Sequence, residues 1–333
     1  MSALVRILPS GHEFVVESDE PLLQAALRSG LALEFGCTNG GCGECKGRVK
    51  SGSVRGIRFH DYVLSEAEKR EGTVLMCCCT ADGDLTIEAG EAGGPDDIPP
   101  QSVRARVYKQ ERAADGVDIV YLRVMRGKML RYLAGQYARL TLAGAHPADV
   151  SIASCPCDGL NLEFHFDRRD RDALSARAFE GFSKSDRFVI EGPRGRFTLD
   201  EDSDRPLLFV AAGTAIAPVK SIIEHAINLE LTQPIHLYWH SEHADGHYLH
   251  NYFRSLTDAL DEFTYVPVEG DSGVEALAGL PGLPDLPDVD AYVAGAERIV
   301  ATVGKLLLEG GLPEERLFVD ALSRRPGSAP TAD

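Results

Sequence analysis

Four cysteines in the amino-terminal part of the chain have the spacing of an iron-sulfur ligand set. Cys37, Cys42 and Cys45 stand in a Cys-x4-Cys-x2-Cys arrangement, and Cys77 follows farther along the chain. Three thiolates in one loop and a distant fourth are the ligands that a 2Fe-2S cluster takes. The loop also carries glycines, which permit positive φ and bring backbone N–H groups close to inorganic sulfide: Gly36, Gly40, Gly41 and Gly43.

Two alternatives to this ligand set follow from the same residues. A structural zinc site usually shows paired Cys-x2-Cys knuckles, and the loop has only one such pair, so the spacing favours the cluster over zinc. The fourth ligand is ambiguous because Cys77, Cys78 and Cys79 are consecutive. We assign Cys77 and keep Cys78 as the alternative.

Length and composition limit the class of protein. A chain of 333 residues suits two or three domains. Neither a signal peptide nor an apolar run long enough to span a bilayer is evident, so we expect a cytoplasmic protein without membrane insertion. In that compartment the eight cysteines would serve metal rather than disulfides. The net charge of −17 disfavours nucleic acid and anionic lipid as partners.

The elements around the cysteines read as a small, largely β unit. Residues 4–8 and 13–17 alternate in the manner of a hairpin, and Pro21 begins a short helix. Ser65 and Glu68 form a capping box for a second helix, and residues 85–88 form a closing strand. Residues 89–101 are rich in Gly, Pro and acidic residues and are interpreted as a linker.

The rest of the chain changes period once. Residues 102–199 contain several alternating strands at short spacing, which predicts an antiparallel barrel. From residue 205 onward, apolar strands alternate with helices, which predicts a doubly wound parallel sheet. Gly213 and Thr214 follow its first strand and precede a helix, where a dinucleotide would bind.

These motifs together resemble a known family. Residues 1 to about 95 resemble a plant-type ferredoxin, and Gly192-Pro-Arg-Gly-Arg-Phe197 and Gly213-Thr-Ala-Ile-Ala-Pro218 are similar to motifs of the ferredoxin-reductase family. The domain order resembles that of the reductase components of bacterial oxygenases and of deoxysugar synthesis. The resemblance implies a multidomain α+β and α/β fold: a β-grasp-type ferredoxin domain with linker (1–97), an antiparallel β-barrel flavin domain (98–202), a doubly wound parallel-sheet NAD domain (203–322) and a disordered tail (323–333).

The resemblance also implies flavin-binding residues, with departures. The family motif Arg-x-Tyr-Ser corresponds to Ala148-Asp149-Val150-Ser151, so both side-chain anchors are replaced. We therefore expect FAD to be weakly held. The implied flavin contacts are Tyr137, Val150, Ser151 and Ser175, with Ser151 at the reactive edge. Arg168, Arg169 and Arg171 would either restore positive charge for the phosphates or form a solvated charged loop.

The nucleotide residues follow in the same way. Glu242 stands where relatives often carry Arg, and a carboxylate there would accept from a free ribose 2′-hydroxyl and repel a phosphate, which favours NADH. Ala294 and Gly295 match a Cys-Gly-Pro motif beside the nicotinamide, with Ala in place of Cys. Asp320, on the closing strand, is assigned with Ser151 to the hydride-transfer site.

Two other groups could carry chemistry. Cys155 and Cys157 form a Cys-x-Cys, which we interpret as two small buried thiols rather than a redox or ligand pair. His240, His243, His247 and His250 have helical spacing, and we interpret them as part of a surface loop and helix rather than a metal site.

The combined prediction is an NADH-dependent iron-sulfur flavoprotein oxidoreductase. Nicotinamide gives two electrons together, an iron-sulfur cluster carries one, and flavin does both, so electrons would pass from NADH through flavin and the cluster to a separate protein. The expected acceptor is a terminal oxygenase or hydroxylase component, with a deoxysugar dehydratase as the alternative. A free flavin reductase with an accessory ferredoxin domain is a second function class, and a non-catalytic iron-sulfur carrier a third.

Overall fold

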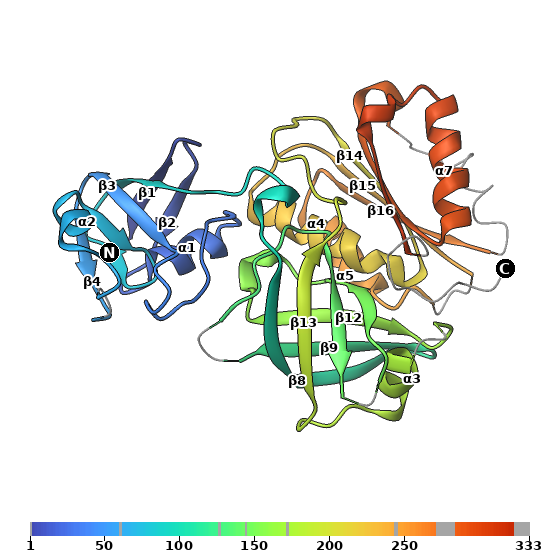
Figure 1. Cartoon of the computed structure of the whole chain (residues 1–333). Coiled ribbons are helices and arrows are strands. Elements are labelled where there is room, and N and C mark those ends of the chain that lie inside the picture. The colour runs from blue at the N-terminus through green and yellow to red at the C-terminus, as the bar shows by residue number, and fades with distance from the viewer. Residues whose placement is uncertain are drawn as a thin grey trace.

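Three main sheets follow one another along the chain, each with its own buried core (Figure 1). The computed structural model describes residues 2–59, 62–125, 128–143, 145–170, 173–242, 246–270 and 284–322. The predicted tail, 323–333, lies outside these residues, and the domain limits proposed above stay predictions. Within the described part of the chain, no helix combines the length and apolarity needed to cross a membrane.

The first sheet has the strand order β2-β1-β7-β3-β5. Its strands are β1 (Ala3–Leu8), β2 (Glu13–Val16), β3 (Lys46–Ser51), β5 (Thr73–Leu75) and β7 (Leu85–Ala89). A separate pair is formed by β4 (Val54–Gly56) and β6 (Cys79–Ala81). The predicted β1–β2 hairpin is confirmed as antiparallel.

Two short helices complete this unit, α1 (Leu22–Arg28) and α2 (Glu66–Arg70). Leu22, Leu23 and Ala26 are buried at helical spacing and pack on the sheet, which explains why so short a helix forms there. The capping box is confirmed: the Ser65 side chain accepts from the Glu68 amide, and the Glu68 carboxylate accepts from the Ser65 amide.

The second sheet is antiparallel, with the order β11-β10-β13-β8-β9-β12. Its elements are β8 (Gln101–Ala114), β9 (Val117–Val124), β10 (Tyr137–Leu142), β11 (Ala148–Ser151), β12 (Asn161–Asp167), β13 (Arg187–Arg194) and the helix α3 (Ala173–Glu180). The edge strands β11 and β12 lie against each other, so the sheet is nearly closed, as the alternating strands predict. Alternate residues such as Val103, Ala105 and Val107 fill its interior.

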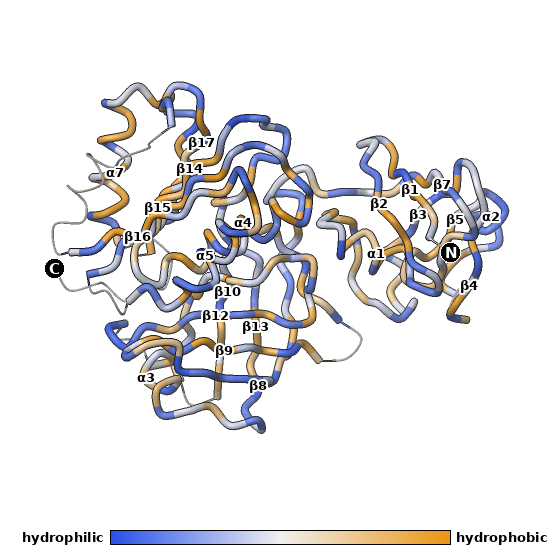
Figure 2. Tube along the Cα trace, turned by 180° about the vertical axis from the view of Figure 1, so that it is seen from behind, coloured by the Kyte–Doolittle hydropathy of each residue, from blue (hydrophilic) through white to orange (hydrophobic). Residues whose placement is uncertain are grey.

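The third sheet is parallel, with the order β16-β15-β14-β17-β18. Its strands are β14 (Leu207–Ala212), β15 (Ile235–Ser241), β16 (Phe263–Glu269), β17 (Asp290–Gly295) and β18 (Leu317–Ala321). Its helices are α4 (Ile216–Asn228), α5 (His250–Ala259) and α7 (Glu297–Glu309). Strand β14 is a continuous buried run because helices cover both faces of the sheet, and Figure 2 shows this apolar band. Helices α4 and α5 cover one face and α7 the other.

Short 3-10 turns join several of these elements. They are η1 (Pro95–Asp97), η2 (Pro156–Asp158), η3 (Gly213–Ala215), η6 (Leu286–Asp288) and η7 (Glu314–Arg316). Helix α5 begins at His250. His247 precedes it, and the His247 Nε2 lies 2.8 Å from the Trp239 carbonyl oxygen.

Candidate functional site

The four predicted cluster cysteines lie as two pairs. The amide of Cys42 donates to Cys37 Sγ at 3.3 Å, and the two side chains also interact. The side chain of Cys45 hydrogen-bonds that of Cys77, which arrives from the distant segment after β5. Cys37, Cys45 and Cys77 are buried and Cys42 is exposed. Two pairs of thiols fit a cluster with two irons, each held by two thiolates.

The backbone around Cys37 favours a charged sulfur. Burial acts to raise the pKa of Cys37, but amide donors from Asn39, Cys42 and Gly41 outweigh it, and the pKa is lowered. For Cys45 the neighbouring Cys77 side chain and burial both raise the pKa. The glycine-rich loop thus supplies the amide donors that a cluster needs, as its sequence predicts.

Of the three consecutive cysteines, Cys77 and Cys78 have neighbouring sulfurs, and Cys79 has a separate partner. Cys79 Sγ donates to the Leu75 carbonyl oxygen at 3.3 Å, and burial raises its pKa to about 12, so it is a structural thiol. Cys78 Sγ lies 3.6 Å from Cys77 Sγ. Arg58 Nη1 donates to the Cys77 carbonyl oxygen at 3.1 Å and steadies this turn. The assignment of Cys77, with Cys78 as the alternative, stays a prediction.

The cysteine loop lies beside the barrel. Phe35 immediately precedes the loop, and the Arg131 guanidinium stands 5.8 Å from its ring centroid. The segment carrying Arg131 is held by Gln101, which donates to the Arg131 carbonyl at 2.8 Å and accepts from its amide at 2.9 Å. The first unit therefore presents its redox loop to the second.

A cavity of about 760 Å³ lies between the barrel, β18 and α7. Tyr137 and Asp320 both line it, and Ser151 is buried directly opposite Tyr137 in the β10–β11 ladder. Gly195, also in the lining, has φ +93°, and a Cβ there would stand 3.0 Å from the Tyr137 ring. The cavity has the size of a cofactor pocket, and two of the predicted residues, Tyr137 and Asp320, line it from separate elements, while Ser151 is buried beside Tyr137 and is not part of the lining.

The altered flavin motif has a different use in this chain. The Arg139 guanidinium binds both carboxylate oxygens of Asp149, at 2.8 and 2.9 Å, and the Asp149 side chain is fully buried. Val150 lies half-buried opposite Ala138. Ser175 is buried in the first turn of α3. The arginine of the family motif is therefore replaced by a barrel ion pair, and weak retention of flavin stays a prediction.

The predicted nucleotide residues gather at the carboxyl edge of the parallel sheet. Gly213 follows β14 with φ +57°, and Trp239 Nε1 donates to its carbonyl at 3.0 Å. Thr214 follows in η3. Ala294 lies opposite Asp320 in the β17–β18 ladder, and Gly295 comes next. Dinucleotides bind outside this edge of such sheets.

Glu242 has a partner that the sequence did not indicate. Arg169 Nη1 lies 3.1 Å from Glu242 Oε2, while Arg169 Nη2 lies 2.7 Å from Asp167 Oδ2. Arg169 thus joins the barrel to the parallel sheet, while its side chain remains 61% exposed, so both interpretations of this arginine stay predictions. Arg168 stacks over Phe179 at 5.1 Å. Arg171 lies outside the described residues.

The structure also contains a buried ionic network that the sequence alone does not indicate. Lys220 Nζ on α4 lies 3.1 Å from Glu163 Oε2 on β12 and 2.7 Å from Glu224 Oε1. Glu163 Oε1 binds His165 Nε2 at 2.7 Å, and His165 Nδ1 contacts the Tyr248 hydroxyl at 2.8 Å. Burial acts to raise the pKa of Glu163, but His165 and Lys220 outweigh it and lower the pKa to about 2. The network locks the barrel to the parallel sheet.

The two remaining groups have the following geometry. His240 Nε2 lies 2.9 Å from the Gly270 carbonyl oxygen, so this ring is hydrogen-bonded to the backbone. The His247 ring is hydrogen-bonded to the backbone in the same way. His243 lies outside the described residues. Cys155 and Cys157 are joined in a disulfide, which corrects the prediction of two free thiols.

Comparison with known proteins agrees with this arrangement. Residues 5–82 match the 2Fe-2S iron-sulfur cluster binding domain, and residues 209–305 match the oxidoreductase NAD-binding domain. The chain is 32% identical over 233 residues to the ferredoxin–NAD(+) reductase component of the alkene monooxygenase system of Xanthobacter autotrophicus, covering 70% of this chain and 71% of that protein. The chain belongs to this family of ferredoxin-type NAD reductases.

Two further proteins match this chain nearly end to end. The CDP-6-deoxy-L-threo-D-glycero-4-hexulose-3-dehydrase reductase of Yersinia pseudotuberculosis is 29% identical, over 96% of this chain and 98% of that protein. A crystal structure of a cytochrome P450 reductase of Amycolatopsis superposes with a TM-score of 0.62 at 24% identity, over 96% of this chain and 98% of that chain. The Amycolatopsis structure shows that the two chains share the three-part fold.

Proposed function

We propose that this chain is an NADH-dependent reductase that passes electrons through FAD and a 2Fe-2S cluster to a separate terminal protein. The observation that carries the proposal is the position of the cysteine loop. It lies against the barrel through Phe35 and Arg131, while the cavity lined by Tyr137 and Asp320 lies between the barrel, β18 and α7. We infer that one chain carries a donor site, a transfer site and an exit site.

The chain's own residues have distinct tasks in this proposal. When bound, flavin would supply the chemistry that joins two-electron transfer from nicotinamide to one-electron transfer at the cluster. Gly213, Thr214 and Gly295 leave room for the nucleotide at the sheet edge, and Ala294 keeps the neighbouring wall small. Tyr137 lines one side of the transfer site, with Ser151 buried opposite it in the β10–β11 ladder, and Asp320 lines the site from β18.

The acceptor that we propose is a terminal oxygenase or hydroxylase component. The Xanthobacter relative is named for an alkene monooxygenase system. The net charge of −17 suits an acceptor with a basic docking face. The near full-length match to a hexulose dehydrase reductase supports a deoxysugar dehydratase as the alternative acceptor. We place the protein in the cytoplasm, where cluster thiolates stay reduced until they bind metal.

An absorption spectrum of the purified protein, before and after NADH is added, tests the proposal. We expect the cluster bands to bleach fully only when FAD is supplied, because the motif's phosphate anchor is missing and Asp149 is bound to Arg139. Retention of one FAD per chain through dialysis would contradict the prediction of weak flavin binding but not the proposed electron route. Failure of the bands to bleach with both NADH and FAD present would contradict the electron route.

The same ion pair supports a second function, reduction of free flavin that diffuses away. Because no motif arginine holds the phosphates, flavin in this case behaves as a substrate. Steady-state kinetics distinguish the two functions. A flavin-dependent rate of NADH oxidation that is unchanged in Cys42→Ser, together with no transfer to any protein acceptor, would favour the flavin reductase.

The Glu242–Arg169 pair makes a prediction about nucleotide choice. Glu242→Gln removes the carboxylate that would repel a 2′-phosphate and leaves Arg169, still bound by Asp167, with spare positive charge. We expect the ratio of kcat/KM for NADPH to that for NADH to rise about tenfold or more, since like charges placed together cost several kcal/mol. The control is Glu262→Gln, which changes an exposed residue at the amino end of β16. An equal ratio in both variants would refute the role of Glu242.

A further inference from the structure

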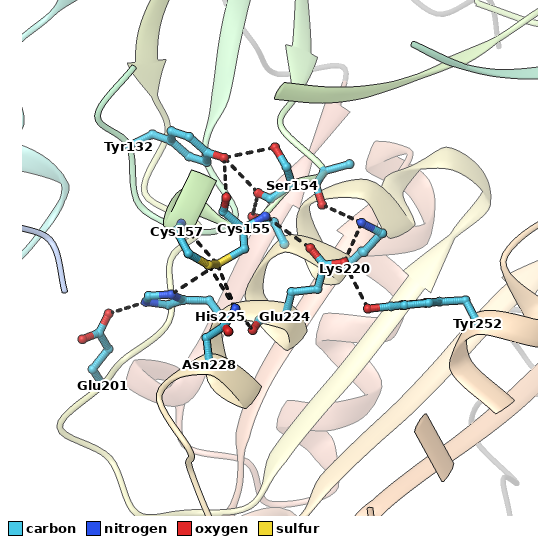
Figure 3. The surroundings of a disulfide bond; sticks show 12 residues. Tyr132, Ser154, Cys155, Cys157, Glu201, Lys220, Glu224, His225, Asn228 and Tyr252 are labelled. Atoms are coloured by element: carbon cyan, nitrogen blue, oxygen red, sulfur yellow. Dashed lines mark hydrogen bonds and ion pairs between the residues drawn. A yellow bond between two sulfur atoms is a disulfide. The ribbon is translucent and has the colours of Figure 1, made fainter. Parts of the chain in front are cut away.

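The Cys155–Cys157 disulfide is surrounded by groups that act on sulfur (Figure 3). His225 Nδ1 lies 3.9 Å from Cys155 Sγ, and the other ring nitrogen, Nε2, lies 2.8 Å from Glu201 Oε1. The His225 ring is therefore oriented by a carboxylate on one side and faces a sulfur on the other. This is the arrangement of a proton carrier held in place.

Hydrogen-bond donors converge on both sulfurs. Asn228 Nδ2 lies 3.0 Å from Cys157 Sγ and 3.4 Å from Cys155 Sγ, and the Cys157 amide donates to Cys155 Sγ at 3.3 Å. Figure 3 shows Asn228 and His225 approaching the pair from helix α4. Donors that point at sulfur stabilise a thiolate over a neutral thiol, so they serve the reduced state more than the disulfide.

The two sulfurs differ in access. Cys155 is 8% exposed, whereas Cys157 is half-buried. The turn η2 that holds them lies beside α1, and a Cβ at Gly30 would stand 3.2 Å from His225 Cε1. The pair therefore lies where the ferredoxin unit meets the reductase units, with one sulfur within reach of an external thiol.

A structural role explains these features poorly. Cross-linking two cysteines that are separated by one residue closes a very short loop, so it removes little entropy from the unfolded chain. In a reducing compartment, the disulfides that do form are usually transient, catalytic or redox-sensing. The electrostatic surroundings and the short loop both favour a pair that cycles.

We propose that Cys155 and Cys157 form a redox-active site that exchanges with a dithiol, with His225 as its proton carrier. A thiolate of the dithiol attacks the accessible Cys157 Sγ, the S–S bond breaks, and Cys155 leaves as a thiolate stabilised by Asn228 and protonated through His225. The second thiol of the dithiol then attacks the reagent sulfur that is bonded to Cys157. This step releases Cys157 and forms a disulfide within the reagent. The site gains two electrons and two protons, and the dithiol becomes a disulfide.

The decisive measurement compares reduction rates in the native and the unfolded protein. Air-oxidised holoprotein is treated with dithiothreitol, quenched with acid and alkylated. The mass of the peptide containing residues 155–157 is then measured by mass spectrometry. We expect reduction at least about tenfold faster in the native protein than in the urea-unfolded chain, because the folded site stabilises the leaving thiolate. A structural disulfide gives the opposite order, because folding shields it, and that order would overturn the proposal.

Two further outcomes of this experiment would also overturn the assignment. Both cysteines could be alkylated before any reductant is added, which would mean that the disulfide does not form. Alternatively, both could be shielded until a chelator removes one zinc per chain, which would mean that Cys155, Cys157 and His225 hold a metal instead.

Variants separate the roles of the neighbours. Asn228→Ala is expected to slow native reduction about tenfold, since it removes a hydrogen bond to a developing charge. Asn251→Ala changes an exposed asparagine on α5 and serves as the matched control, with an unchanged rate expected. His225→Gln is expected to change the pH profile that remains after each native rate is divided by the thiolate fraction of dithiothreitol, because the variant lacks the proton carrier. Unchanged rates and an unchanged profile in these variants would refute the roles of Asn228 and His225.

Discussion

Cys77→Ser is expected to yield protein that has lost nearly all of its iron and acid-labile sulfide. The loss should exceed the about 10–100-fold cost of removing an outer-shell partner, because a direct ligand is removed. Cys77 lies against Cys45, whereas Cys79 is turned to the Leu75 carbonyl, so we predict that Cys77 is the ligand from the distant segment, with Cys78 as the alternative. Iron and sulfide assays on anaerobically purified protein measure the effect.

Cys78→Ser is the matched control for this variant. It alters a neighbouring buried thiol in the same turn and should leave the cluster in place. With FAD supplied, NADH oxidation by a small-molecule acceptor should persist in Cys77→Ser, which shows that the reductase units remain folded. If Cys78→Ser lost the cluster and Cys77→Ser kept it, the ligand assignment would move to Cys78.

Lys220→Met should lower the free energy of unfolding by about 3–5 kcal/mol, because it removes the buried cation that lies between the Glu163 and Glu224 carboxylates. Lys220 is 7% exposed, and among the described residues it alone forms ion pairs with both carboxylates. Trp239, the one tryptophan of the chain, is fully buried in β15 and reports unfolding by fluorescence in urea.

The control for this variant is Lys305→Met, which removes an exposed lysine paired with Glu309 at 3.7 Å on α7. A change within about 0.5 kcal/mol is expected there, since exposed ion pairs contribute little. Equal midpoints for Lys220→Met and the wild type would show that the network does not stabilise the fold.

The network also sets an acid limit. Because the pKa of Glu163 is lowered in the folded chain to about 2 from an ordinary 4.5, its contribution is fully present above about pH 4.5 and is lost as the pH falls toward 2. The wild type should therefore lose stability over that interval in urea titrations. Lys220→Met, which lacks one of the cations that lower the pKa, should show a smaller loss there.

The redox loop and the order of elements follow from local sequence. The cysteine spacing, the glycines around it and the capping box of Ser65 and Glu68 involve residues that are close in the chain, so their geometry is set by local backbone rules. The switch from alternating strands to apolar strands and helices likewise shows in a window of ten to twenty residues.

The partners of isolated charges and thiols do not follow from local sequence. Asp149 lies between the two replaced flavin anchors, Ala148 and Val150, and only the β10–β11 register places Arg139 against it. Arg169 and Glu242 come from different sheets, and Cys155 meets His225 only when α4 packs beside η2. Each pairing depends on how the sheets pack.

What the sequence alone determined is therefore the identity of the redox loop, the order of the sheets and the edge at which a dinucleotide would bind. Local periodicity and short ligand spacings carry that information. The tertiary structure decided that Lys220 joins the barrel to the parallel sheet and that Arg169 forms an ion pair with Glu242. It also decided that Cys155 and Cys157 form a disulfide beside His225. Most of these contacts join residues far apart in the chain. The type of a buried polar side chain shows that it requires a hydrogen-bond or ion-pair partner, but only the packing of the elements shows which residue is that partner.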